Sequence, residues 1–130
     1  MDETSAGPAA VVRHFCEVVC RRDLQQVRPL LTDDVVYHNI PMEPATGLEA
    51  TLGVLGTFYD MFEAMEFRIV HLAVDGSTVL TERVDVLTSR GRQASLPVMG
   101  AFEVTGDQIA AWRDYFDMAQ VTAVLTPEGS

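Results

Sequence analysis

An arginine and an aspartate within residues 79–87 could do acid–base chemistry. The alternating strand pattern of this segment puts Arg83 and Asp85 on one face, between Val79 and Leu87. A charge on an apolar face is costly unless it is paired, and burial shifts the pKa of a carboxyl group. The pattern therefore indicates a buried ion pair, and the simpler alternative is an ordinary pair on the solvated face.

A second carboxylate repeats this arrangement within residues 111–117. Asp114 alternates with Trp112 and Phe116, so the three side chains share a face. Two carboxylates in one apolar interior do not ionise with equal ease, and one can then serve as an acid while the other serves as a base. We therefore interpret Asp85 and Asp114 as candidate catalytic groups. The simpler alternative for Asp114 is a carboxylate at a strand end or turn.

Two polar residues of an earlier segment could join these charges. Within residues 35–40, Tyr37 and Asn39 share a face with Val35, whereas His38 takes the other face. Taken singly they are weak signals, because a buried tyrosine often bonds only to the backbone and an asparagine before Ile-Pro often begins a turn. A strongly curved sheet covered on one side by helices has one large interior, and we expect the polar groups to meet there.

The spacing of apolar residues predicts the helices and strands that carry these side chains. Helical patterns precede the strands, and from residue 67 the period changes to two. Helices are predicted near residues 8–19, 24–30 and 48–62. Strands are predicted near residues 35–40, 67–74, 78–89, 94–104 and 108–117. Helices followed by an antiparallel meander are typical of an α+β domain in which helices pack on one face of a curved sheet.

Length, composition and charge restrict the possible functions. A chain of 130 residues that is 48% hydrophobic suits a single domain, residues 1–130, with a core around a pocket. The formal net charge of -10 disfavours nucleic acid and anionic membranes as partners, because both favour basic patches. No apolar run is long enough to span a bilayer, and residues 1–8 lack the basic-then-apolar order of a signal peptide. We expect a cytoplasmic protein.

The cysteines and histidines do not predict a metal site. Cys16 and Cys20 lie four residues apart in a helical pattern, which matches neither a CxxC pair nor a zinc site and favours buried thiols. The histidines are scattered, without HxxxH or HxH spacing, at His14, His38 and His71. We expect neither a metal nor any other cofactor.

Three blocks of the sequence resemble the motifs of the limonene-1,2-epoxide hydrolases in order and spacing. They are Tyr37-x-Asn39-x-Pro41, residues 81–87 (TERVDVL) and residues 112–117 (WRDYFD). The resemblance implies a cone-shaped α+β fold like that of nuclear transport factor two and ketosteroid isomerase. In such a fold a strongly curved, mixed or antiparallel sheet carries helices on its concave side.

The resemblance also implies a reaction. A small hydrophobic epoxide, such as limonene-1,2-epoxide or another cyclic alkene oxide, would be hydrolysed to a vicinal diol in one step without a cofactor. Asp114 would act as general base on a water molecule that Tyr37 and Asn39 also hold. Asp85 would protonate the epoxide oxygen, while Arg83 bridges both carboxylates. An epoxide is a poor electrophile at neutral pH, so an acid at oxygen and a base at water must act together.

Apolar neighbours of these groups are expected to bind the substrate. They are Leu87, Leu96, Val98, Trp112 and Phe116. The resemblance implies a homodimer as well, joined through the outer face of the sheet, where the residues of opposite parity include Val84, Val86 and Ala111. Small hydrophobic epoxide and water would be the other partners.

Two other functions are open. An isomerase or cyclase of the same fold would use one aspartate to remove a proton next to a carbonyl group, although Arg83 between two carboxylates suits an enolate site poorly. A non-catalytic protein could bind an apolar metabolite in the same pocket. Assays of a racemic epoxide and a β,γ-unsaturated ketone distinguish the two enzymes, and ligand-induced stabilisation without turnover would favour the binding protein. The chain has no G-x-S-x-G elbow, so the alkyl-enzyme route of α/β-hydrolases is not supported.

Overall fold

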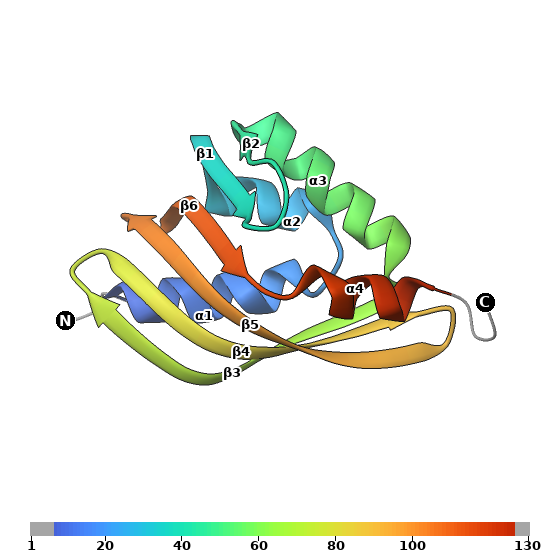
Figure 1. The fold of residues 1–130 in the computed structure, drawn as a ribbon. Coiled ribbons are helices and arrows are strands. Elements are labelled where there is room, and N and C mark those ends of the chain that lie inside the picture. The colour runs from blue at the N-terminus through green and yellow to red at the C-terminus, as the bar shows by residue number, and fades with distance from the viewer. Residues whose placement is uncertain (1–6, 127–130) are drawn as a thin grey trace.

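The computed structural model describes residues 7–126, which form one six-stranded sheet that curves around its helices (Figure 1). The strands lie in the order β2-β1-β6-β5-β4-β3. Their bounds are β1 Leu31–Asn39, β2 Ala45–Thr46, β3 Ala64–Asp75, β4 Thr78–Ser89, β5 Arg92–Thr105 and β6 Gln108–Tyr115. The helices are α1 Gly7–Val19, α2 Leu24–Val27, a 3-10 turn Arg28–Leu30, α3 Leu48–Met61 and α4 Met118–Leu125. The predicted α+β class, with helices on the concave side of a curved sheet, is confirmed.

The longer helices pack on the sheet through one apolar side. In α1 the side chains of Val12, Phe15 and Cys16 are buried, and the helix lies against β3, β4 and β5. Helix α3 packs on β1. The Tyr59 hydroxyl of α3 donates a hydrogen bond of 2.6 Å to the carbonyl of Val19, which joins α3 to the end of α1. Helices α1 and α3 therefore cover different strands of the sheet and are joined to each other.

The sheet is mixed, because β1 enters it in parallel. Strands β3 to β6 form the predicted antiparallel meander. Strand β1 then pairs with β6 in parallel, with Tyr37 beside Trp112 and Asn39 beside Asp114. This pairing joins segments that are about 75 residues apart in the chain, and it brings the first motif block next to the last one.

Several predicted boundaries were wrong. Strand β1 begins at residue 31 rather than 35, and residues 32–34 lie inside the strand at an irregularity in its register. The helix expected at residues 24–30 gives way to a 3-10 turn at Pro29, because proline lacks the N–H that continues an α-helix. Strands β3 and β5 begin at residues 64 and 92, earlier than expected. Strand β6 ends at residue 115 instead of 117, and the unpredicted α4 follows it.

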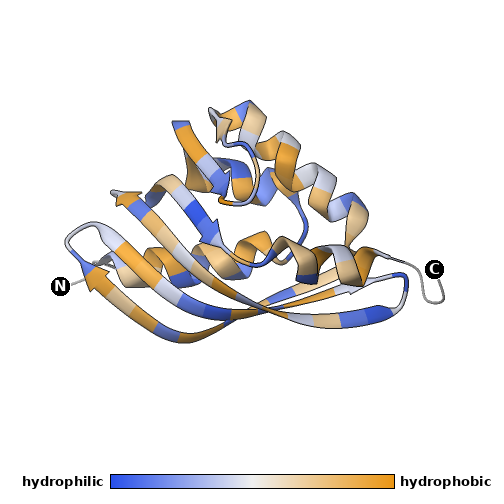
Figure 2. Cartoon of the chain, viewed as in Figure 1, coloured by the Kyte–Doolittle hydropathy of each residue, from blue (hydrophilic) through white to orange (hydrophobic). Residues whose placement is uncertain are grey.

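The two faces of the sheet differ in burial, as strand parity predicts. Hydrophobic and hydrophilic segments alternate along the strands in Figure 2. On β4 the inward side chains Arg83 and Asp85 are buried, whereas Leu80 and Glu82 of the outer face are exposed. The three apolar residues expected on the outer face are half-buried or buried within this chain: Val84, Val86 and Ala111. Parity therefore identified the interior side of the sheet correctly.

Two expectations concern the relation of the chain to membranes. Among residues 7–126, the helices are all too short or too polar to cross a bilayer. The acidic segment of residues 1–6, on which the expectation about a signal peptide partly rested, lies outside the described residues.

Candidate active site

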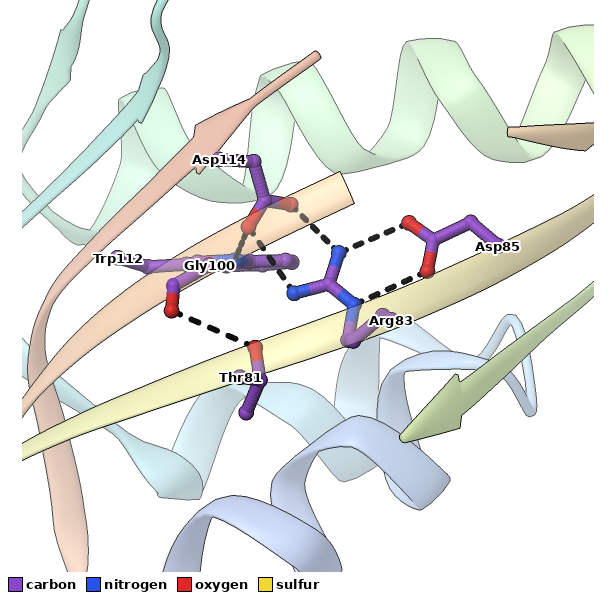
Figure 3. A network of polar contacts seen from close by, with 6 residues as sticks. All are labelled: Thr81, Arg83, Asp85, Gly100, Trp112 and Asp114. Carbon is purple, nitrogen blue, oxygen red and sulfur yellow. Dashed lines mark hydrogen bonds and ion pairs between the residues drawn. The ribbon is translucent and has the colours of Figure 1, made fainter. Parts of the chain in front are cut away.

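Arg83 joins the two aspartates in the interior of the cone (Figure 3). Its Nε and Nη2 donate to Asp85 Oδ1 and Oδ2 at 3.0 and 2.8 Å. Its Nη1 and Nη2 donate to Asp114 Oδ1 and Oδ2 at 3.0 and 2.9 Å. Both pairs are bidentate, and bidentate geometry fixes the planes of the two carboxylates as well as their distances. The structure thus brings together the three charges that strand parity placed on one side.

Aromatic rings and the two carboxylates enclose the Arg83 guanidinium. The ring centre of Phe67 lies 4.5 Å from its central carbon, and that of Phe102 lies 6.0 Å away. Burial lowers the pKa of Arg83, but the charges and hydrogen bonds of Asp114 and Asp85 outweigh burial and hold its pKa well above the ordinary value. The Arg83 guanidinium is therefore a permanent positive charge that is buried in the site.

Asp114 is also held by the strand that carries it. The indole Nε1 of Trp112 donates to Asp114 Oδ1 at 2.9 Å. The Trp112 ring stacks on Tyr37 with a centroid distance of 4.1 Å, and Phe15 meets it edge-on at 5.1 Å. Trp112 is fully buried by these contacts. Its role in the structure is to orient Asp114 and Tyr37.

The protonation of Asp85 differs from that of an ordinary aspartate. Burial raises its pKa from 3.8 to about 6, although the hydrogen bonds and charge of Arg83 oppose the rise and the nearby Asp114 adds to it. One guanidinium can compensate only one of two buried carboxylates, so the second binds a proton more readily. Asp85 is thus able to carry a proton close to neutral pH, as a general acid requires.

Tyr37 and Asn39 of β1 lie at the same site. Burial and the nearby Asp114 charge raise the pKa of Tyr37, so its hydroxyl keeps its proton and can donate a hydrogen bond. A hydrogen bond with the Asn39 side chain opposes this rise. The backbone carbonyl of Asp114 accepts a hydrogen bond of 2.9 Å from the N–H of Ile40, which fixes the end of β1 beside β6.

These groups open onto a cavity of about 260 Å³. Four of the five predicted catalytic residues contribute to its wall: Tyr37, Asn39, Asp85 and Asp114. Arg83 lies behind the two carboxylates and has no surface in the cavity. The rest of the wall is almost wholly apolar, and it includes Leu87, Leu96, Val98 and Phe116 as expected. Trp112, expected to bind substrate, does not line the cavity, because Tyr37, which does line it, is stacked on its ring.

Sequence reasoning missed about half of the cavity wall. Helix α4 supplies four of these residues, at the helical spacing i, i+3, i+4 and i+7: Met118, Val121, Thr122 and Leu125. The signal for this helix is Asp117, whose side chain accepts a hydrogen bond from the N–H of Ala119 as an N-cap. The other residues that were not assigned to substrate binding are Met42, Phe58, Met61, Phe62, Met65 and Phe67.

Among the residues that the structure describes, neither cysteine lines the cavity. Burial raises the pKa of Cys16 to about 12, which keeps this thiol protonated, and Cys20 is half-buried. Within residues 7–126, no three His, Cys, Asp or Glu side chains are close enough together to hold a metal ion. The expectation that the protein needs no cofactor stays a prediction.

Several known proteins are similar to this chain in sequence and in fold. The family model of the limonene-1,2-epoxide hydrolase catalytic domain matches residues 6–126. Epoxide hydrolase EphG of Mycobacterium tuberculosis is 34% identical over 107 residues, which are 82% of this chain and 71% of that protein. A solved structure of an M. tuberculosis LEH-like epoxide hydrolase has a TM-score of 0.79 at 31% identity and covers 91% of this chain and 88% of that one.

A more distant structure supports the fold alone. An NTF2-like protein from Burkholderia pseudomallei has a TM-score of 0.82 at 20% identity, over 92% of this chain and 98% of that one. The expected likeness to nuclear transport factor two is thereby confirmed. From the family model and the similarity to EphG, this chain belongs to the limonene-1,2-epoxide hydrolase family.

Proposed function

We propose that this chain, as a single domain, hydrolyses a small apolar epoxide to a vicinal diol by direct attack of water. Membership of the family supports epoxide hydrolysis in general. The observation that carries the proposal is the Arg83 guanidinium bound to two carboxylates that both face one apolar cavity. This arrangement offers a proton donor and a proton acceptor to one small substrate, and an epoxide needs both at once.

Asp114 is the proposed general base. Its carboxylate is oriented by Arg83 and Trp112, and it shares the cavity wall with Tyr37 and Asn39. A water molecule beside these three side chains would donate one proton to Asp114 and accept a hydrogen bond from the Tyr37 hydroxyl. Such a water would be aligned for attack on an epoxide carbon and would lose its proton to Asp114 as the C–O bond forms.

Asp85 is the proposed general acid. Its raised pKa of about 6 leaves a fraction of Asp85 protonated near neutral pH, far more than for an ordinary aspartate. An apolar substrate that displaces water from the cavity would favour the neutral carboxyl further, because burial disfavours the charged form. The proton passes to the epoxide oxygen as the ring opens. Arg83 touches neither water nor substrate and acts as a positioning residue that holds both carboxylates.

The cavity favours a small hydrocarbon epoxide as the substrate. About 260 Å³ is near the lower end of ligand pockets in general. Away from the Tyr37, Asn39, Asp85 and Asp114 end, nearly all of the wall is aliphatic, aromatic or methionine side chain. A substrate whose only polar atom is the epoxide oxygen matches this wall, and cyclic alkene oxides such as limonene-1,2-epoxide have that composition.

Substitution of each aspartate tests the assigned roles. Asp114→Asn and Asp85→Asn should each reduce diol formation by roughly 10² to 10⁴, the usual contribution of one general acid or base. Circular dichroism should show that both variants keep the fold. Retention of most of the activity by either variant would contradict its role. A β,γ-unsaturated ketone assayed in parallel would reveal an isomerase instead.

Isotope labelling tests direct attack by water. In a single turnover in oxygen-18 water, the label should appear in the diol at once. Label recovered in an aspartate side chain would mean that an ester with the enzyme forms first, and would refute the one-step mechanism.

We also propose that the protein forms a homodimer through the outer face of the sheet. Val70, Met99 and Tyr115 expose about half of their surface there and line a hollow, which Val84, Pro97 and the charged Glu82 also line. An exposed apolar patch of this kind is typical of an interface. Met99→Glu should convert a dimer into a monomer in analytical ultracentrifugation. A wild-type monomer, or a variant that stays dimeric, would refute this interface.

A further inference from the structure

We infer that Gly100 is a positioning residue of the active site, because the space left by its missing side chain is where the Arg83 guanidinium reaches Asp114. The inference deepens the proposed function and rests on it for the catalytic consequence. The residue lies on β5, opposite Thr81 of β4 and Asp114 of β6 in the register of the sheet. It is buried on the inner face, between the strand that carries the arginine and the strand that carries the base.

A side chain at this position would collide with the charge network. A Cβ atom on Gly100 would lie 2.5 Å from Arg83 Nη1, 2.8 Å from Asp114 Oδ1 and 2.8 Å from Thr81 Oγ1 (Figure 3). All three distances are shorter than those that real Cβ atoms show. Gly100 is not among the glycines with positive φ, so the backbone does not require glycine here. What glycine supplies at residue 100 is room.

The groups around this space cannot easily move away. The guanidinium lies against the Phe67 ring and is fully buried, and Asp114 is held by the Trp112 indole. The nearest atom to the added Cβ is Arg83 Nη1, which makes the 3.0 Å hydrogen bond to Asp114 Oδ1. The Nε atom that binds Asp85 is on the other edge of the guanidinium. A methyl group should therefore loosen Arg83 from Asp114 and leave its link to Asp85 largely in place.

Gly100 should therefore affect the chemical step more than substrate binding. It does not line the cavity, so a methyl group there takes no room from the substrate. Asp114, by contrast, would lose its hydrogen bond from Arg83 Nη1, and its carboxylate would no longer be held in one plane. A base whose carboxylate is no longer held in one plane is less often aligned with the attacking water, so the chemical step slows.

The Gly100→Ala variant tests this inference against a matched control. Gly53→Ala adds the same methyl group at an exposed position of α3 where nothing lies within 4 Å. We expect Gly100→Ala to lower kcat by roughly 10- to 100-fold, the loss typical of one charge-assisted hydrogen bond, with KM changed less than about twofold. Wild-type kcat, or a loss that appears only in KM, would overturn the inference.

A measurement of stability keeps the test independent of activity. Arg83→Lys retains the buried positive charge but has no Nη1 atom in the space where the Cβ of residue 100 would lie. Gly100→Ala should reduce the free energy of unfolding much less in the Arg83→Lys background than in the wild type. Equal losses in both backgrounds would show that the harm does not come from the guanidinium, and so would failure of Gly100→Ala to fold in the Arg83→Lys background. If wild-type protein opens no epoxide, the proposed function fails while this cycle still decides the geometry.

Discussion

Burial of Asp85 should make the protein less stable as the pH rises from about 4 to about 6. The folded state raises the pKa of Asp85 from 3.8 to about 6, so over this range the folded state binds a proton that the unfolded state has released. The stabilisation is complete below pH 4 and is lost as the pH passes 6. A rise of about two pKa units, at about 1.36 kcal/mol each, corresponds to about 3 kcal/mol.

The Asp85→Asn variant isolates this contribution, because an amide does not titrate. The assay is urea unfolding of the wild type and the variant between pH 4 and pH 8. Trp112, the single tryptophan of the chain, is fully buried, so its fluorescence reports loss of the packed interior. The free energy of unfolding of the wild type minus that of the variant should fall by about 3 kcal/mol between pH 4 and pH 7.

Asp107→Asn is the matched control, because it makes the same substitution at an exposed position in the turn between β5 and β6. A wild type minus Asp85→Asn difference that is flat would show that Asp85 is not desolvated by the fold. A difference that increases with pH would show that Arg83 dominates over burial, which reverses the direction of the pKa shift.

Three further predictions concern the same site. Because Asp85 must hold its proton to act as an acid, kcat/KM should fall as the pH rises past about 6, and an increase from pH 6 to pH 8 would contradict that role. Trp112→Phe keeps a ring but removes the hydrogen-bond donor to Asp114. Urea unfolding followed by circular dichroism should show that the free energy of unfolding falls by about 1–3 kcal/mol. Stability equal to that of the wild type would mean that this hydrogen bond does not stabilise the fold. Phe67→Leu removes the ring whose centre lies 4.5 Å from the central carbon of the Arg83 guanidinium, and it should lower the free energy of unfolding by about 1–2 kcal/mol. An unchanged free energy of unfolding would mean that the cation–π contact contributes no stability.

Strand parity explains why so much of the site could be predicted. Side chains on a strand alternate between two faces, so Arg83 and Asp85 had to point the same way, and the apolar residues beside them indicated which way was inward. The same reasoning placed Asp114 and Tyr37 in the interior, where both are buried. These assignments depend only on local geometry, and a local pattern is sufficient to make them.

The cavity wall was harder to predict, because helix α4 and the loops come to it from separate parts of the chain. The predicted strand ran two residues past the end of β6, over Asp117, and so hid the residue that caps α4. Trp112 shares a face with Asp114, as parity required, yet Tyr37 of β1 stacks on its ring and lines the cavity in its place. Which inward residues reach the substrate depends on what covers them.

The alternation of polar and apolar residues along each strand is enough to tell which side chains are inside, because a slip of one residue would expose the whole apolar face. Which of these side chains meet depends on the three-dimensional arrangement of the strands. The parallel pairing of β1 with β6 put Asn39 beside Asp114, and the absence of a side chain at Gly100 let Arg83 reach across β5. Contacts between distant segments depend on how the sheet curves and which strands become neighbours, and no local pattern encodes those distances.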